Sequence, residues 1–164
     1  MTEKRKCVFA GSFDPPTLGH KTLVETALQM FDEVVVAVMV NPLKTPYFTT
    51  EERKEMLALD MGDPRVKIID FEGTVAELLK RENTKIYLRG IRNGVDLDFE
   101  NANFYASRKL DPELTAVYLP CPQELLHVSS SIVRNSLHFK TPIDEYVSEK
   151  VKAYIEKRTP TKEN

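Results

Sequence analysis

The stretch GSFDPPTLGH, residues 11–20, decides how this chain folds. It follows the short apolar run KCVFA (6–10), which is typical of a buried strand, and it precedes a run with helical spacing over 21–31. A simple turn needs little more than an Asn-Gly pair, whereas this loop contains two glycines, two prolines, an acid and a histidine. A stiff polar loop between a strand and a helix is typical of a ligand-binding loop in an α/β protein.

Apolar runs and helical patterns alternate along the rest of the chain. The strand-like runs are almost continuously apolar, which favours central strands of a parallel sheet buried on both faces. These runs are 6–10, 34–40, 66–71, 85–88 and 114–120. Helical patterns occupy 21–31, 50–61, 74–81, 95–110, 129–137 and 146–157. The order predicts an α/β fold with a doubly wound, five-stranded parallel sheet and right-handed crossovers.

Composition favours one globular domain spanning residues 1–164, with a disordered tail at 158–164. The net charge of −2 gives no field that would attract nucleic acid or an anionic membrane. The apolar run from Val34 to Val40 is far shorter than the roughly 20 residues that span a bilayer, and MTEKRK does not resemble a signal segment. Cys7 and Cys121 have no metal-like spacing, so we expect reduced thiols and a cytoplasmic protein.

Polar residues that could bind a ligand follow each predicted strand. Open parallel sheets bind ligands beyond the carboxyl ends of their strands, so these segments are expected to meet at one edge. The segments are 11–20, NPLKTPYFTTEER (41–53), FEGT (71–74), RGIRNG (89–94) and PCPQELLHVSSSIVR (120–134).

Each feature of this edge also has a plain structural explanation. Thr17 could be a helix cap, Lys44 a solvated charge, Arg89 and Arg92 a surface pair, and Ser129–Ser131 a cap with spare serines. Together, however, helix N-termini and Arg side chains suit phosphate oxygens, and we interpret the edge as a polyphosphate site. The dinucleotide fingerprint, the Walker A motif and the nucleophile elbow are absent from the sequence, and no carboxylate cluster predicts a metal site.

The same motifs resemble those of the bacterial phosphopantetheine adenylyltransferases, a family of the nucleotidyltransferase superfamily. Residues 17–20 (TLGH) resemble the T/HxGH signature, and VSSSIVR (128–134) resembles the second signature. With NPLKTPYFTTEER and RGIR, the resemblance covers roughly residues 5–157. It implies a Rossmann-like nucleotidyltransferase fold and adenylyl transfer from ATP to 4′-phosphopantetheine, giving dephospho-coenzyme A and pyrophosphate. Mg²⁺ would arrive with ATP.

The resemblance also implies roles for individual residues. Those implied for catalysis are His20, Lys44 and Arg92. Those implied for phosphopantetheine are Ser12, Lys44, Val75 and Arg89. Those implied for ATP are Ser12, Phe13, His20, Gly90, Ile91, Arg92, Glu100, Leu125, Leu126, His127, Val128, Ser129, Ser130 and Ser131. The acceptor phosphate is already an anion, so neither a general base nor a covalent intermediate is expected; His20, Lys44, Arg92 and two helix N-termini would supply positive potential.

Two alternatives to this function remain open at the level of sequence. One is adenylyl transfer to nicotinate mononucleotide, although relatives with that acceptor usually have His where this chain has Thr17. The other is a non-catalytic nucleotide or coenzyme A sensor, which would not need to retain His20, Lys44, Arg89 and Arg92.

The sequence departs from the family pattern at a few places and predicts self-association at another. Ser12 stands where the family usually has Thr, and Leu125, Ser107 and Asn135 also differ from the usual residues. The family implies a homo-oligomer, specifically a hexamer. Residues 95–110 carry an apolar set that needs a partner surface, namely Phe99, Ala102, Ala106 and Leu110.

Overall fold

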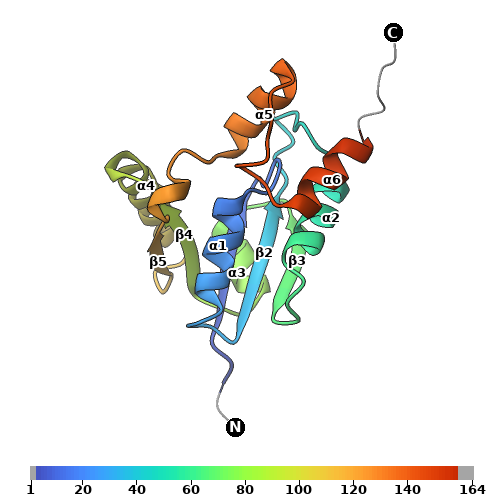
Figure 1. Ribbon diagram of the computed structural model, residues 1–164. Coiled ribbons are helices and arrows are strands. Elements are labelled where there is room, and N and C mark those ends of the chain that lie inside the picture. Colours follow the sequence, from blue (N-terminus) through green and yellow to red (C-terminus); the bar gives the residue numbers. More distant parts are fainter. Residues whose placement is uncertain (1–2, 159–164) are drawn as a thin grey trace.

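The computed structural model describes residues 3–158 and contains a five-stranded sheet of order β3-β2-β1-β4-β5 (Figure 1). Neighbouring strands all pair in parallel. The strands are β1 (Lys6–Gly11), β2 (Glu33–Met39), β3 (Val66–Phe71), β4 (Ile86–Ile91) and β5 (Thr115–Pro120). The chain order reverses between β1 and β4, so the predicted α/β class and doubly wound parallel sheet are confirmed.

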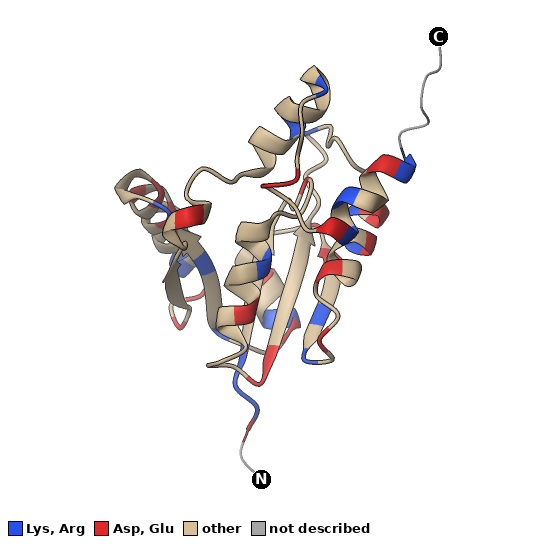
Figure 2. Cartoon of the chain, viewed as in Figure 1, with Lys and Arg blue, Asp and Glu red and all other residues tan. Residues whose placement is uncertain are grey.

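Helices cover both faces of the sheet, with α1 in front of it and α3 behind it in Figure 1. The helices are α1 (Leu18–Ala27), α2 (Thr50–Asp60), α3 (Val75–Arg81), α4 (Gly94–Leu110), α5 (Ser130–Phe139) and α6 (Glu149–Arg158), with a short 3₁₀ helix, η1 (Gln123–Leu125). In Figure 2, both acidic and basic residues occur along α2 and α6. No helix among residues 3–158 is both long and apolar enough to cross a membrane.

The core consists of three apolar clusters. Alternate residues of β1 face opposite sides: Phe9 packs in the cluster under α1 and α2, and Val8 packs in the cluster under α3. A third cluster joins α5 and α6 to α2 through Met56, Val133 and Val151, and it includes Phe48 just before α2. This third cluster matters for the site because it anchors α5 beside the carboxyl edge of the sheet.

Helix starts gather at the same edge as the strand ends. Thr17, Thr49 and Thr74 each form a capping box with the residue three positions later, and Ser129 caps α5. In a parallel α/β fold the helix that follows a strand begins near that strand's carboxyl end. The edge therefore combines helix N-termini with the loops singled out in the sequence.

Several boundaries differ from the sequence-based expectation, most clearly those of β4, α1 and α6. Strand β4 runs through Arg89 and Gly90 to Ile91, where the sequence places the end at residue 88, because this polar segment remains paired with β5. Helix α1 begins at Leu18 and ends at Ala27, and the chain then turns. Arg158, assigned to the tail by the sequence, lies in α6; residues 159–164 fall outside the described part of the chain.

Candidate active site

A cleft of about 400 Å³ lies at the carboxyl edge, where the strand order reverses between β1 and β4. Open α/β sheets bind ligands at this position. The cleft is lined by the loop after β1, by α1, by the end of β4, by α4 and by the segments on either side of η1. The predicted residues that line it are Ser12, Phe13, His20, Arg89, Gly90, Arg92, Glu100, Val128, Ser129 and Ser130.

Other predicted residues lie outside the cleft lining. These are Lys44, Val75, Ile91, Leu125, Leu126, His127 and Ser131. Lys44 is exposed in the loop after β2, and Val75 is the first residue of α3, on the opposite face of the sheet from α1. The structure thus brings most of the proposed ATP residues together, whereas two proposed acceptor residues, Lys44 and Val75, lie outside the cleft.

The cleft also contains residues that the sequence analysis missed. From α1 come Thr22, Leu23 and Thr26, which follow Gly19 at helical spacing and share its face. That spacing could have identified them. Asp96 and Phe99 of α4 and the Pro120–Pro122 segment also line the cleft, and they depend on tertiary packing that no local motif indicates.

The loop after β1 is fixed by hydrogen bonds to its carbonyl oxygens. Arg53 of α2 donates from Nη1 to the Ser12 carbonyl oxygen at 2.8 Å. From α5, Arg134 donates to the Asp14 carbonyl at 2.7 Å, and Ser130 Oγ donates to the Pro15 carbonyl at 2.7 Å. Two helices distant in sequence thus hold this loop in one conformation.

Phe13 adopts a backbone conformation that is rare for a bulky residue. Its φ is 49°, in the left-handed region, and its side chain is almost fully buried. Its ring packs edge-on against Phe9, with centroids 5.1 Å apart, and against His20, with centroids 4.9 Å apart. A Cβ at Gly11 would meet the Phe13 ring at 3.3 Å, so the glycine leaves room for this arrangement. Strain at Phe13 is thus offset by packing that also orients the histidine.

His20 is oriented by the helix cap. Its Nδ1 accepts a hydrogen bond from the Thr17 backbone N–H at 3.0 Å, which places the proton of the neutral ring on Nε2. Burial, reinforced by Arg89 and Arg92, lowers the pKa of His20 from 6.5 to about 4. The expectation that His20 supplies positive charge is therefore corrected: with this pKa, His20 is an uncharged hydrogen-bond donor near neutral pH.

The two arginines of β4 and its following loop are each paired with an acid of α4. Arg89 donates from Nη1 to the Ala10 carbonyl and from Nη2 to Glu100 Oε1, both at 2.6 Å. Its Nε is buried and has no hydrogen-bond partner among the described residues. Arg92 pairs with Asp96 at 3.2 Å. The guanidinium groups are thus held in place by protein groups, and Arg89 retains an unused donor.

The two helix N-termini at the cleft differ in how many amides they leave open. In α1, Leu18 N–H donates to the Tyr146 carbonyl and His20 N–H donates to Thr17 Oγ1. Of the first backbone N–H groups of α1, that of Gly19 then has no partner among residues 3–158 and is left free for a ligand. In α5, Ser129 Oγ accepts from Ile132 N–H, and within the described chain the Ser130 and Ser131 amides have no partner. The start of α5 therefore offers an anion more free donors than the start of α1.

The chemistry of the cleft is that of hydrogen-bond donors and guanidinium groups. Within residues 3–158, no three His, Cys, Asp or Glu side chains gather in a group that could hold a metal ion. The arrangement can bind phosphate oxygens and can stabilise charge that develops on them.

Comparison with known proteins adds family information to this geometry. A family model described as cytidylyltransferase-like matches residues 8–136. Two relatives named phosphopantetheine adenylyltransferase are 40% identical to the chain. That of Flavobacterium johnsoniae aligns over 134 residues, 81% of this chain and 88% of the relative. That of Streptococcus suis aligns over 152 residues, 92% of this chain and 94% of the relative.

A solved structure shares the fold. It is described as "a Putative Nicotinate-nucleotide Adenylyltransferase from Vibrio parahaemolyticus", with a TM-score of 0.72 and 24% sequence identity. The match covers 94% of this chain and 93% of the other. At this identity the likeness extends to the nucleotidyltransferase fold alone.

Proposed function

The chain belongs to the phosphopantetheine adenylyltransferase family, and from that membership we propose how it carries out adenylyl transfer, a step of coenzyme A biosynthesis. A phosphate oxygen of 4′-phosphopantetheine attacks the α-phosphorus of ATP in line. The new P–O bond joins the two molecules as dephospho-coenzyme A, and the bond from the α-phosphorus to the leaving oxygen breaks to release pyrophosphate. No bond to the protein forms at any stage.

One observation carries this proposal: the cleft gathers His20, Arg89, Arg92 and the open N-terminus of α5. These groups donate hydrogen bonds and accept none from phosphate. His20, held by Thr17, directs its Nε2 proton toward ATP phosphate oxygens and stabilises the charge that builds up in the transition state. Arg92 and the Ser129–Ser131 amides bind the remaining phosphate oxygens of ATP.

The acceptor phosphate is bound by Ser12, Arg89 and Lys44 in this proposal. Ser12 and Arg89 line the cleft, and the exposed Lys44 side chain closes on the phosphate when the acceptor binds. Val75 contacts the pantetheine arm. The acceptor is ionised at neutral pH, so positioning and charge stabilisation suffice without a general base.

Mg²⁺ has a limited role in this proposal. It is carried by the phosphates of ATP and keeps several water ligands, as Mg²⁺ commonly does. The donor groups of the cleft then share the phosphate charge with the ion.

We expect the reaction to take place in the cytoplasm.

A homo-oligomer, specifically a hexamer, is the proposed assembly. Helix α4 has Glu100 as its one buried residue, while Val95, Phe99 and Leu110 are 78, 64 and 67% exposed. We expect such an exposed apolar surface to be buried against another subunit. Leu110→Glu is expected to lower the mass measured by light scattering at micromolar concentration, and a monomeric wild-type protein would contradict the proposal.

The acceptor assay tests the function directly. Pyrophosphate release is measured with 4′-phosphopantetheine and with nicotinate mononucleotide at equal ATP and Mg²⁺. We expect kcat/KM to favour phosphopantetheine by at least about 10³, roughly 4 kcal/mol, because the two acceptors share a phosphate and little else. Comparable rates would overturn the acceptor assignment, and no release with either would indicate a binding protein without catalysis.

A further inference from the structure

We propose that Asp14 is a positioning residue that fixes the loop carrying Lys44 (residues 40–49, the acceptor loop) and so sets the affinity for the acceptor phosphate. The inference rests on the proposed function, since it takes Lys44 to bind that phosphate. Asp14 itself touches neither substrate in this proposal, and it is absent from the lining of the cleft.

The Asp14 carboxylate joins two loops that follow neighbouring strands. Its Oδ2 accepts a hydrogen bond from Tyr47 N–H and its Oδ1 accepts one from Phe48 N–H, each at 2.8 Å. Asp14 is only 7% exposed, so solvent weakens these charge-assisted bonds little. The Asp14 carbonyl is held in turn by Arg134, and the carboxylate therefore projects from a fixed backbone.

The acceptor loop depends on these bonds because it is attached only near its ends. At its start, Val40 N–H donates to the Phe71 carbonyl at 2.8 Å. Residues 41–47 are exposed, and Lys44 lies within a local turn closed by its N–H on the Asn41 carbonyl. The next long-range attachment after Lys44 is Tyr47 to Asp14, three residues later.

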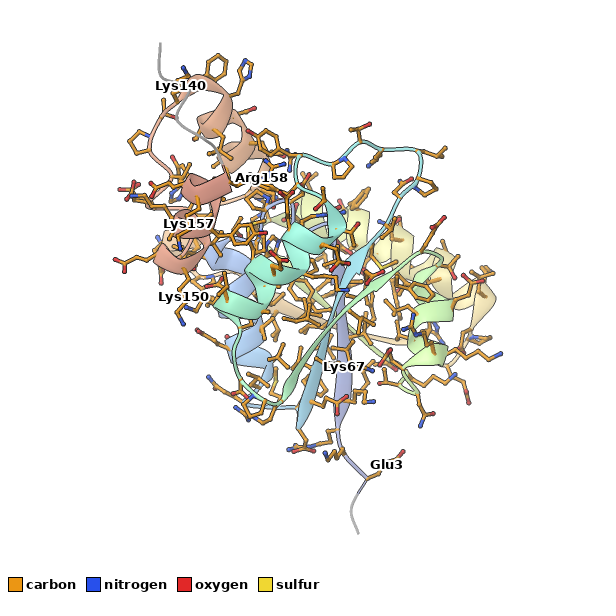
Figure 3. All side chains as sticks on the ribbon, turned by 90° about the vertical axis from the view of Figure 1, so that its right-hand side faces the viewer. Glu3, Lys67, Lys140, Lys150, Lys157 and Arg158 are labelled. Carbon is orange, nitrogen blue, oxygen red and sulfur yellow. The ribbon has the colours of Figure 1, made fainter. Side chains whose placement is uncertain are left out.

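Phe48 has further support, which limits the damage expected when Asp14 changes. Its side chain is 1% exposed, and the Arg158 guanidinium lies 4.7 Å from its ring centroid. Arg158, labelled in Figure 3, also bonds to Glu52 at the start of α2. Arg158 also donates to the Tyr47 carbonyl at 3.5 Å and lies 6.0 Å from the centroid of the Tyr47 ring. Without the Asp14 carboxylate, Phe48 is therefore expected to remain packed while the Tyr47 amide and the exposed segment before it loosen.

A carboxylate is the group this position requires. Two backbone N–H groups converge on it, and two oxygens accept one bond each. An asparagine amide has a single oxygen, and its NH₂ would face the second N–H. Asp14→Asn therefore leaves a buried backbone donor unpaired while it barely alters side-chain volume.

A double-mutant cycle with Lys44→Ala tests the proposal. Alone, Lys44→Ala is expected to raise the KM for phosphopantetheine about tenfold to 100-fold. Asp14→Asn is expected to raise the same KM nearly as far as Lys44→Ala does and to leave the Kd for ATP within about twofold. In the Asp14→Asn background, Lys44→Ala is then expected to add less than about twofold, because the lysine is already misplaced. Hydrogen exchange at the Tyr47 and Phe48 amides should accelerate in Asp14→Asn.

Glu82→Gln is the matched control. Glu82 is also buried, at 4% exposed, and it pairs with Lys67 at the opposite edge of the sheet, so kinetics and acceptor-loop exchange should match wild type. An undiminished effect of Lys44→Ala in the Asp14→Asn background would overturn the positioning role. No effect of Lys44→Ala on its own would instead refute the proposed acceptor site. If Asp14→Asn does not fold, Asp14→Glu displaces the carboxylate while keeping its charge and enters the same cycle.

Discussion

The loops after β1 and β2 lie at the same edge of the sheet and each contains two prolines, yet they differ in exposure and in the long-range contacts that hold them. In residues 11–20, Phe13 and Thr17 are 1 and 2% exposed, and α2 and α5 bond to the backbone. In the acceptor loop, Leu43 is 93% exposed. Proline restricts φ in both loops, but only long-range partners hold a loop in place.

The difference matches the parts that the two loops play in the proposed reaction. A group that stabilises a transition state must be held within fractions of an ångström, and His20, in the first turn of α1, is held by the Thr17 cap where the loop after β1 ends. An acceptor with a long flexible arm can be bound by a loop that closes on it, and Lys44 lies in the exposed acceptor loop.

The largest contrast is expected in stability. Phe13→Ala removes a buried ring from packing against Phe9 and His20 and should lower the free energy of unfolding by about 3–5 kcal/mol. Leu43→Ala should change it by less than about 0.5 kcal/mol, since that side chain is solvated. Urea unfolding of both variants measures the contrast. Similar losses in the two would mean that the acceptor loop is packed as firmly as the first.

A contrast in kinetics should follow. His20→Ala is expected to lower kcat by on the order of 10²- to 10³-fold while ATP binding changes much less, because a transition-state donor is lost. Lys44→Ala should act mainly on the KM for the acceptor, by about 1.5–3 kcal/mol. Steady-state kinetics with each substrate varied, together with direct ATP titration, separates the two. Loss of ATP affinity in His20→Ala as large as the loss of kcat would contradict the transition-state role.

The smallest effect expected is a dependence of stability on pH through His20, in the first turn of α1. The pKa of His20 is about 4 in the native state and 6.5 by reference in the unfolded state, so between these values the unfolded chain binds the proton and the native protein does not. The contribution of His20 to stability is thus complete above about pH 6.5 and is lost as the pH falls toward 4. His20→Gln removes the titration but keeps an acceptor for the cap. The stability of wild type relative to His20→Gln, measured as the difference in their free energies of unfolding, should fall from pH 7.5 to pH 5. A difference that stays constant would exclude a lowered pKa.

The sequence was sufficient for the fold because its signals are local. Near-continuous apolar runs such as 34–40 require burial on both faces, and capping residues such as Thr49 mark where helices begin. The polar ends of the strands likewise identified the edge that holds the cleft. Periodicity and capping act over a few residues, so no alignment of distant segments is needed to detect them.

Tertiary structure alone decided the state of the groups at that edge. The sequence shows that His20 is present, but its neutral form depends on burial beside Arg89 and Arg92. It shows Asp14 beside two prolines, but the hydrogen bonds to Tyr47 and Phe48 span more than 30 residues. Desolvation and hydrogen bonding depend on distances that only the folded chain creates. The sequence by itself determined which loops meet at the edge of the sheet, and the packing of the helices and of the acceptor loop decided which residues line the cleft and which of them are fixed or charged.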